Sequence, residues 1–321
     1  FIYPKFPDTF WSFTYALSFI GKKAAFPPLG LLTVASLLPD EWPKRLVDVN
    51  VDNLTDKDLL WADMAFIGGM AVQRKSAKQI IARCNASNLK VVAGGPLFTS
   101  EFDEFKNVDH LVLDEAELTL PAFLSDLQNG RLKKVYRASG FCDLCDTPTP
   151  SWELVKMKRY ASMNIQFSRG CPFDCEFCNV TALFGHRPRL KTPQQIISEL
   201  NRIYASGWRS SIFFVDDNFI GNKGYLKKQL LPALIQWRKD KKGCVFFTEA
   251  SINLADDPEL LDMMVTAGFD SVFIGIESPD EVSLAECHKT QNKNRDLLES
   301  VAIIHRSGLQ VMGGFIVGFD S

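Results

Sequence analysis

The stretch MNIQFSRGCPFDCEFCNVT, residues 163–181, determines the architecture that we expect for the second half of the chain. It joins a short apolar strand pattern to Ser-Arg-Gly and then to three cysteines, Cys171, Cys175 and Cys178, within eight positions. In a β/α fold the loop that follows a strand lies on the face where active sites collect. We therefore expect a β/α architecture that brings these three thiols together at one end of its sheet.

Strand and helix patterns alternate from this stretch onward, which is typical of parallel sheets built from βαβ units. Strands are expected at 163–170, 210–217, 244–251, 271–278 and 309–319, with helices at 193–206, 226–239, 258–267 and 294–307. Five strands at this spacing predict a partial β/α barrel.

The first half of the chain shows the same alternation. Strand patterns cover RLVDVNV, DMAFIGGM, KVVAGGP and DHLVLDE, and helical patterns cover residues 28–38, 75–87 and 117–129. Four or five strands at this spacing predict a doubly wound parallel sheet of the Rossmann-like class. The opening FIYP reads as the tail of a strand.

A Thr-Pro-Thr-Pro run separates the two halves and disfavours both helix and sheet. We expect a first domain at 1–135, a linker at 136–160 and a second domain at 161–321. The chain opens without methionine and stops on a strand pattern, GGFIVGFDS. We therefore expect a first domain truncated at its N-terminus and a barrel truncated at its C-terminus.

The composition is that of a soluble globular protein, with 46% apolar residues, 23% charged residues and a formal net charge of -2. No basic field indicates a nucleic-acid partner, and no uninterrupted apolar run is long enough for an integral membrane segment. Eight cysteines without a signal peptide indicate a reducing, cytoplasmic compartment in which clustered thiols bind metal.

The three clustered cysteines allow two kinds of metal site, because thiolates suit both iron–sulfur clusters and zinc. A structural zinc needs a fourth ligand, which His186 or Cys244 could supply. A four-iron cluster held by only three cysteines leaves one iron open for chemistry.

The C-x-x-x-C-x-x-C spacing, with aromatic Phe177 before the last cysteine, resembles the cluster motif of the radical S-adenosylmethionine (SAM) enzymes. The resemblance implies that Cys171, Cys175 and Cys178 ligate a 4Fe–4S cluster and that Phe177 lies beside the cofactor. It also implies that the open iron chelates the amino and carboxylate groups of SAM. Reduction of the cluster then cleaves SAM to a deoxyadenosyl radical.

The same resemblance implies SAM-binding residues at the ends of the next strands. Asp216 and Asp217, in FFVDDNF, are candidates for the SAM amino group, because a carboxylate accepts charge-assisted hydrogen bonds from an ammonium. The alternative for Asp216 is a turn or helix cap after a strand. Glu249 and Ser251, in FFTEASINL, fall where the family contacts the ribose or carboxylate of SAM.

In FIGIES, Gly275 and Ile276 would border the adenine, with Glu277 at the strand end. Ordinary strand-end polarity is the alternative for these positions.

The phrases FPPLGLLTVASLLP, VDVNVD, AGGPLFT and VDHLVLDEAELTLPAFLSDLQNG resemble, in that order, the cobalamin-binding domain that precedes the barrel in one radical SAM class. The D-x-H-x-x-G motif that places a histidine beneath cobalt is absent, and His110 is interpreted as structural. Cobalamin would therefore bind without that lower ligand.

Two glycine pairs are the candidate cobalamin contacts. Gly68 and Gly69 end one strand of the first domain and Gly94 and Gly95 end another, where the lack of a side chain lets a ligand approach the backbone. Thr99 could hydrogen-bond the nucleotide tail of the cofactor, with a surface role as the alternative.

The phrases YPKFPDTFWSF, SRGCPFDCEFCNVTALFGHRPR, VDDNFIGNK and SINLADDPEL resemble the branch of cobalamin-dependent radical SAM proteins that includes hopanoid methylases. This resemblance implies a methyltransferase for unactivated carbon centres, with a lipid as the favoured substrate. The deoxyadenosyl radical would abstract a hydrogen from the substrate, which would then take a methyl group from methylcobalamin.

Two other functions stay open. One is a radical SAM enzyme that forms rings or rearranges carbon skeletons without methylating, and the other is a non-catalytic zinc-binding protein. The resemblance also implies a reductant such as a flavodoxin or ferredoxin. A lipid substrate would favour a cytoplasmic protein that associates peripherally with a membrane.

Overall fold

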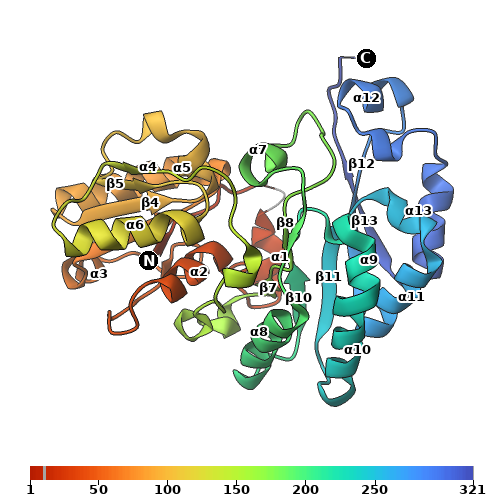
Figure 1. The fold of residues 1–321 in the computed structure, drawn as a ribbon, viewed down its shortest axis with the longest axis horizontal. Helices are drawn as coiled ribbons and strands as arrows, with labels where there is room; N and C mark the ends of the chain where they lie inside the picture. Colours follow the sequence, from red (N-terminus) through yellow and green to blue (C-terminus); the bar gives the residue numbers. More distant parts are fainter. Residues whose placement is uncertain (10–11, 321) are drawn as a thin grey trace. The chain divides into compact units, whose positions relative to one another are not determined.

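The structure is a computed structural model that describes residues 1–9 and 12–320. The chain divides into two compact units, Phe1–Ala161 and Ser162–Ser321, and each contains its own parallel sheet (Figure 1). The predicted parallel α/β fold is therefore confirmed. Among the described residues, every helix is too short or too polar to cross a lipid bilayer.

The sheet of the first unit has six parallel strands in the order β2-β1-β3-β4-β5-β6, so the strand order reverses at β1. The strands are β1 (Ile2–Tyr3), β2 (Val47–Asp48), β3 (Met64–Gly68), β4 (Lys90–Gly94), β5 (His110–Val112) and β6 (Val135–Tyr136). Four or five strands were expected. The additional strand is β6, which has two residues and is too short to give a periodic pattern.

Helices cover both faces of this sheet (Figure 1). On β3, Ala65 and Ile67 pack toward α4, whereas Phe66 packs toward α2 and α6, because successive strand side chains point to opposite faces. The helices are α1 (Thr14–Phe19), α2 (Leu29–Leu37), α3 (Asp56–Trp61), α4 (Arg74–Ala86), α5 (Pro96–Ser100) and α6 (Ala116–Gln128).

The segment after β6 contains 3₁₀ turns at Leu144–Asp146, Trp152–Leu154 and Met157–Arg159. Its backbone packs on the first unit, where the Ser151 amide donates to the Leu32 carbonyl at 3.1 Å. The buried Tyr160 hydroxyl donates to Asp48 at 2.9 Å. These contacts hold the segment to the first unit as far as Ala161.

The main sheet of the second unit has five parallel strands in the order β13-β12-β11-β10-β7. Neighbouring strands follow one another along the chain, which is the arrangement of a partial β/α barrel. The strands are β7 (Met163–Ile165), β10 (Ser211–Phe214), β11 (Val245–Ala250), β12 (Phe269–Glu277) and β13 (Gln310–Phe315).

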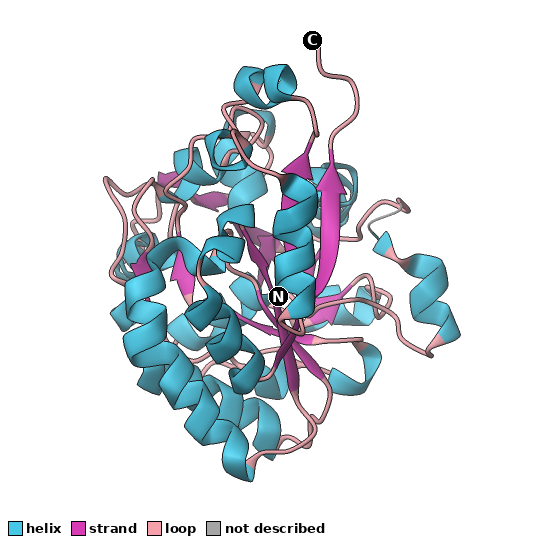
Figure 2. Ribbon diagram, turned by 90° about the vertical axis from the view of Figure 1, so that its right-hand side faces the viewer, coloured by secondary structure: helices cyan, strands magenta, loops and turns pink. Residues whose placement is uncertain are grey.

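Helices pack against these strands (Figure 2). Helix α8 begins where the Thr192 side chain accepts from the Gln195 amide, and Pro193 occupies its first turn. The helices of this unit are α7 (Val180–Phe184), α8 (Pro193–Ala205), α9 (Lys223–Tyr225), α10 (Leu231–Asp240), α11 (Pro258–Ala267), α12 (Glu281–Glu286) and α13 (Leu297–Arg306). A short π-helix at Leu226–Leu230 joins α9 to α10.

Aromatic side chains distinguish the two faces of the second sheet. Phe214 and Phe246 are buried, 5.3 Å apart between ring centroids, and Phe246 lies 6.0 Å from Trp237 of α10. Phe213 and Phe247 stack at 4.8 Å on the opposite face. Odd-numbered residues of β10 and β11 therefore point toward the inside of the partial barrel.

Candidate functional site

The three clustered cysteines lie in a loop, residues 170–188, that we call the cysteine loop. Two short antiparallel strands, β8 (Ser168–Arg169) and β9 (Arg189–Leu190), close this loop at its base. Gly170 has a φ of 99°, and a Cβ there would lie 2.9 Å from the carbonyl oxygens of both Gly185 and Arg187. Gly170 is therefore required for the two ends of the cysteine loop to approach each other.

The three thiols are each partly buried. Burial raises the pKa of the Cys171 and Cys178 thiols, and the neighbouring Cys175 raises both further. A backbone hydrogen bond of 3.0 Å from Cys178 to the Cys175 carbonyl holds the last two cysteines in one turn. Metal binding would displace the protons that these thiols retain.

Cys244 is not placed to be the fourth ligand of a zinc ion bound by the three clustered cysteines. That residue is buried directly before β11, at the amino end of the strand, whereas the cysteine loop follows the carboxyl end of β7. His186 is exposed. Within residues 1–9 and 12–320, no three His, Cys, Asp or Glu side chains are grouped closely enough to hold a single metal ion.

The donor set fits a four-iron cluster better than a mononuclear zinc. In a 4Fe–4S cluster each cysteine binds a different iron, so the thiols need not converge on one point. Three soft thiolates on three of the four irons would leave the fourth iron open. Cys171, Cys175 and Cys178 could therefore hold such a cluster.

Asp216 and Asp217 follow β10 but have different surroundings. Asp216 is 1% exposed, and its carboxylate accepts from the Phe167 amide at 3.1 Å and from the Ser168 amide. Burial raises the pKa of Asp216 to about 7, although these hydrogen bonds oppose the shift. Asp216 thus anchors the segment that leads into the cysteine loop.

Asp217 lies in the turn after β10 and is less buried than Asp216. It accepts a hydrogen bond from the Gly170 amide, and burial raises its pKa. Its charge also raises the pKa values of Cys171 and Cys178. Of the two aspartates, Asp217 has the position of a cofactor ligand, and its role as one stays a prediction.

Glu249 and Ser251 stand at the end of β11. Burial raises the pKa of Glu249 to about 7, and the charges of Asp217 and Asp216 add to this shift. The Ser251 hydroxyl donates to Asn253 at 2.6 Å. The carboxyl groups thus form a partly buried acidic cluster beside the cysteine loop, and such a cluster favours a cationic ligand.

Gly275, Ile276 and Glu277 end β12, where a second segment contacts them. The Asn292 side-chain amide donates to the carbonyls of Gly275 and Ile276, both at 3.0 Å. Lys289 donates to Glu277 at 2.8 Å. The sequence analysis did not identify Lys289 and Asn292, because they belong to no motif. They lie 12 to 17 positions along the chain from the β12 residues that they contact.

The glycine pairs of the first unit lie side by side, because Gly68 of β3 is in register with Gly94 of β4. A Cβ on Gly68 would meet the Leu31 side chain at 3.0 Å, and one on Gly94 would collide with the Val112 carbonyl. Protein packing therefore accounts for glycine at both positions. Gly95 has a φ of 87° and is followed by α5, and cobalamin contacts at these pairs stay a prediction.

Thr99 and His110 both have structural partners in this unit. The Thr99 hydroxyl accepts from the Asp114 amide at 2.9 Å. The His110 Nδ1 atom lies 2.7 Å from the Lys133 carbonyl, and its ring packs on Phe123. A cofactor contact by Thr99 would therefore add to an existing hydrogen bond.

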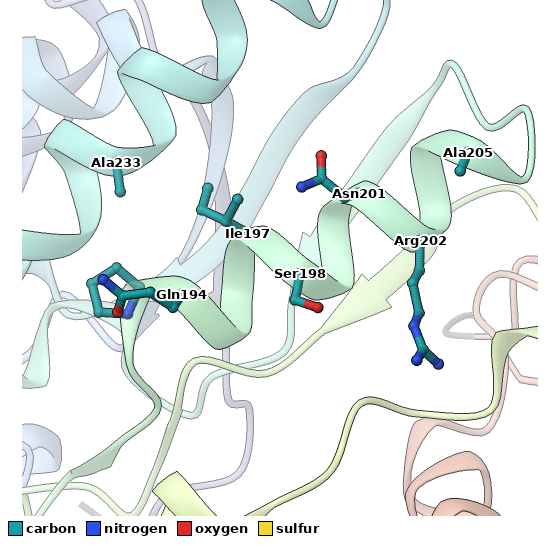
Figure 3. A pocket seen from close by; sticks show the side chains of 8 residues that line it. Gln194, Ile197, Ser198, Asn201, Arg202, Ala205 and Ala233 are labelled. Atoms are coloured by element: carbon teal, nitrogen blue, oxygen red, sulfur yellow. The ribbon is translucent and has the colours of Figure 1, made fainter.

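A separate groove of about 580 Å³ lies on the outer helical layer of the second unit, between α8 and α10 (Figure 3). Ile197, Asn201 and Arg202 line it from α8, and Ala233 lines it from α10. None of the sequence-predicted site residues borders this groove. The candidate site therefore lies at the carboxyl ends of the strands rather than among these helices.

The comparisons with known proteins give relatives along nearly the whole chain. Residues 165–321 match the family model of the Radical SAM superfamily. The chain is 48% identical over 99% of its length to an uncharacterized methyltransferase of Synechocystis sp., of which it covers 60%. It is 38% identical over 100% of its length to the hopanoid C-2 methylase of Rhodopseudomonas palustris, of which it covers 62%. The chain thus spans about three fifths of these curated relatives.

Two solved structures share the fold. The radical S-adenosylmethionine methyltransferase TsrM of Kitasatospora setae, with cobalamin and a 4Fe–4S cluster bound, has a TM-score of 0.73 at 13% identity, over 99% of this chain and 69% of that one. The cobalamin-dependent S-adenosylmethionine radical enzyme OxsB, with aqua-cobalamin bound, has a TM-score of 0.72 at 20% identity, over 91% of this chain and 47% of that one. Residues 165–321 are thus similar to the Radical SAM superfamily, and the chain as a whole is similar to the hopanoid C-2 methylase.

Proposed function

We propose that this chain belongs to an enzyme that methylates an unactivated carbon with the help of a 4Fe–4S cluster, SAM and cobalamin. The observation that carries the proposal is the cysteine loop, with three partly buried thiols beside the carboxylates of Asp217 and Glu249. Homology to the hopanoid C-2 methylase supports methyl transfer as the reaction.

When bound, the cluster and SAM would supply a carbon radical, and cobalamin would supply the methyl group. The task of Cys171, Cys175 and Cys178 is to hold the cluster and leave one iron open to SAM. Phe177, 47% exposed, would cover one side of it.

The acidic cluster supports the binding of SAM, which carries a positive sulfonium and an ammonium. Burial raises the pKa values of Asp217 and Glu249, and the charge of Asp217 adds to the shift of Glu249, whereas Arg169 opposes the shift of Asp217. A bound cation would relieve this repulsion and favour the ionised carboxylates. Gly275, Ile276 and Glu277 would border the adenosine part from β12.

We assign cobalamin to the first domain, residues 1–135, with 136–160 as the linker and 161–321 as the radical SAM domain. The support is the reversal of strand order at β1, beside which Gly68–Gly69 and Gly94–Gly95 end neighbouring strands. Ligands of doubly wound sheets bind outside the carboxyl ends of the strands at such a point. His110 is the only histidine of this domain and it is held by Lys133, so a lower histidine ligand is not part of the proposal.

The proposed substrate is an apolar molecule, in line with the lipid named for the hopanoid C-2 methylase. The stacked Phe213 and Phe247 make part of the inner face of the partial barrel apolar. The proposed electron donor is a flavodoxin or ferredoxin.

The test is anaerobic reconstitution with iron, sulfide and hydroxocobalamin, followed by metal analysis and absorbance spectra. We expect about four irons per chain with a retained corrin band. A matched pair of variants locates the cluster, because Cys175→Ala should lose it while Cys84→Ala, at a buried thiol in the first unit, should keep it. Zinc without iron would overturn the proposal, and iron without corrin would remove cobalamin from it.

The product distinguishes methylation from the ring-forming or rearranging alternative. A methylated product is heavier than the substrate by one CH₂, whereas a rearranged product has the mass of the substrate. Mass spectrometry of a lipid extract incubated with the loaded protein and methyl-labelled SAM would show the added label.

A further inference from the structure

The segment Cys287–Asn292, which we call the support segment, contacts three consecutive residues of the cysteine loop. The Gln291 amide donates to the Cys175 Sγ atom at 3.7 Å, and the Glu176 backbone amide donates to the Cys287 carbonyl at 3.1 Å. The Lys289 ammonium lies 5.7 Å from the centre of the Phe177 ring.

The support segment is itself fixed to the sheet. On one side of Gln291, Lys289 pairs with Glu277 at 2.8 Å. On the other side, the fully buried Asn292 donates to the two carbonyls at the end of β12. The Gln291 side chain is therefore presented to the cysteine loop from a rigid base.

The Gln291 amide has its nitrogen, and not its oxygen, toward the sulfur. Its Oε1 atom is buried and has no hydrogen-bond partner within the described residues. Its Nε2 atom is directed at Cys175. A thiolate accepts hydrogen bonds and cannot donate one, so only this orientation satisfies the sulfur.

Hydrogen bonds to cysteine sulfurs are among the features that set the reduction potential of an iron–sulfur cluster. A donor stabilises negative charge on sulfur, and the reduced cluster carries one more negative charge than the oxidised cluster. A donor at Cys175 therefore favours the reduced state and raises the potential.

We infer that Gln291 is a positioning residue that raises the reduction potential of the proposed cluster through its hydrogen bond to Cys175. The inference rests on the proposed function, because it requires iron at Cys175. Lys289, Cys287 and Asn292 hold Gln291 in place for this role. This role of Gln291 does not depend on the identity of the substrate or of the methyl donor.

The experiment measures the midpoint potential of the reconstituted chain by an EPR-monitored titration without SAM. Gln291→Leu removes the donor, and Thr290→Val, at an exposed neighbour in the same segment, is the control. We expect Gln291→Leu to disfavour reduction by roughly three- to tenfold, which is a shift of about 30–60 mV to more negative potential for one electron. Thr290→Val should match the unmodified chain.

A second variant keeps the test decisive if Gln291→Leu disturbs folding. Gln291→Glu has nearly the same shape and replaces the donor by a carboxylate, so its potential should be more negative still. Either variant with four irons and an unchanged potential would overturn the inference while leaving the proposed function intact. Failure of the unmodified chain to bind iron would overturn both.

Discussion

Lys289 and Glu277 form an ion pair of 2.8 Å that lies directly against Gly275. Both side chains are largely buried, with exposed fractions of 11% and 9%. A Cβ on Gly275 would lie 2.8 Å from the Lys289 ammonium and would collide with the Glu277 carboxylate. The end of β12 therefore depends on glycine to make room for the pair.

Replacing Gly275 by alanine should displace the ion pair and lower the stability of the second unit by about 1–3 kcal/mol, the range for overpacking a filled site. Thermal unfolding would measure the loss. The control is Gly30→Ala in α2, where an added Cβ meets nothing within 4 Å. That change should be neutral or stabilising by up to about 1 kcal/mol, because alanine is the better helix former. Equal melting temperatures for the two variants would contradict the packing argument.

The buried ion pair between Lys191 and Glu199 gives a second prediction. The two groups are 2.6 Å apart with exposed fractions of 2% and 1%. Glu199→Gln leaves the Lys191 ammonium buried without a counter-charge and should cost about 3–5 kcal/mol. Chemical denaturation would measure this loss.

An exposed pair of the same length provides the control. Arg306 and Glu299 are also 2.6 Å apart, but their exposed fractions are 63% and 55%. Glu299→Gln should cost only about 0.2–1 kcal/mol, because solvent screens the charges. If the two glutamate variants lost similar stability, burial would not be the cause.

The sequence predicted those parts of the molecule that periodic patterns and short motifs report. Apolar periodicity predicted the strands near residues 64, 90, 211 and 245 and the helix at 193–206. The three cysteines were recognisable from their spacing alone. The structure then separates Asp216, which is buried and hydrogen-bonded to the Phe167 and Ser168 amides, from the less buried Asp217.

Other features depend on contacts between distant segments, which a single sequence does not reveal. Gln291 meets Cys175 across 116 positions, and Glu176 meets Cys287 across a similar interval. The two-residue strands β8 and β9 are too short for a periodic signal. Gly94 was interpreted as a cofactor contact because it ends a strand. In the structure, glycine is required there because the backbone of the neighbouring strand leaves no room for a Cβ.

The raised pKa of Glu249 predicts a pH dependence of stability. Its folded-state pKa of about 7 exceeds its ordinary value of 4.5, so between these values the folded chain retains a proton that the unfolded chain has released. Glu249 therefore lowers stability as pH rises through this window. Glu249→Gln removes the effect and should raise the melting temperature at pH 8 but not at pH 4.5. A gain of the same size at both pH values would contradict the assigned pKa shift.

Replacing Asp216 and replacing Asp217 by asparagine should have different effects. Asp216→Asn replaces one of two carboxylate oxygens that accept backbone hydrogen bonds from Phe167 and Ser168, so it should lower the melting temperature and the iron content together. Asp217→Asn removes a negative charge beside the cysteine loop, so it should weaken SAM binding while the chain keeps its fold and its iron. Calorimetric titration of SAM into the two reconstituted variants, with thermal unfolding of each, separates these effects. If Asp217→Asn bound SAM as tightly as the unmodified chain, the Asp217 carboxylate would have no role in holding the cationic ligand.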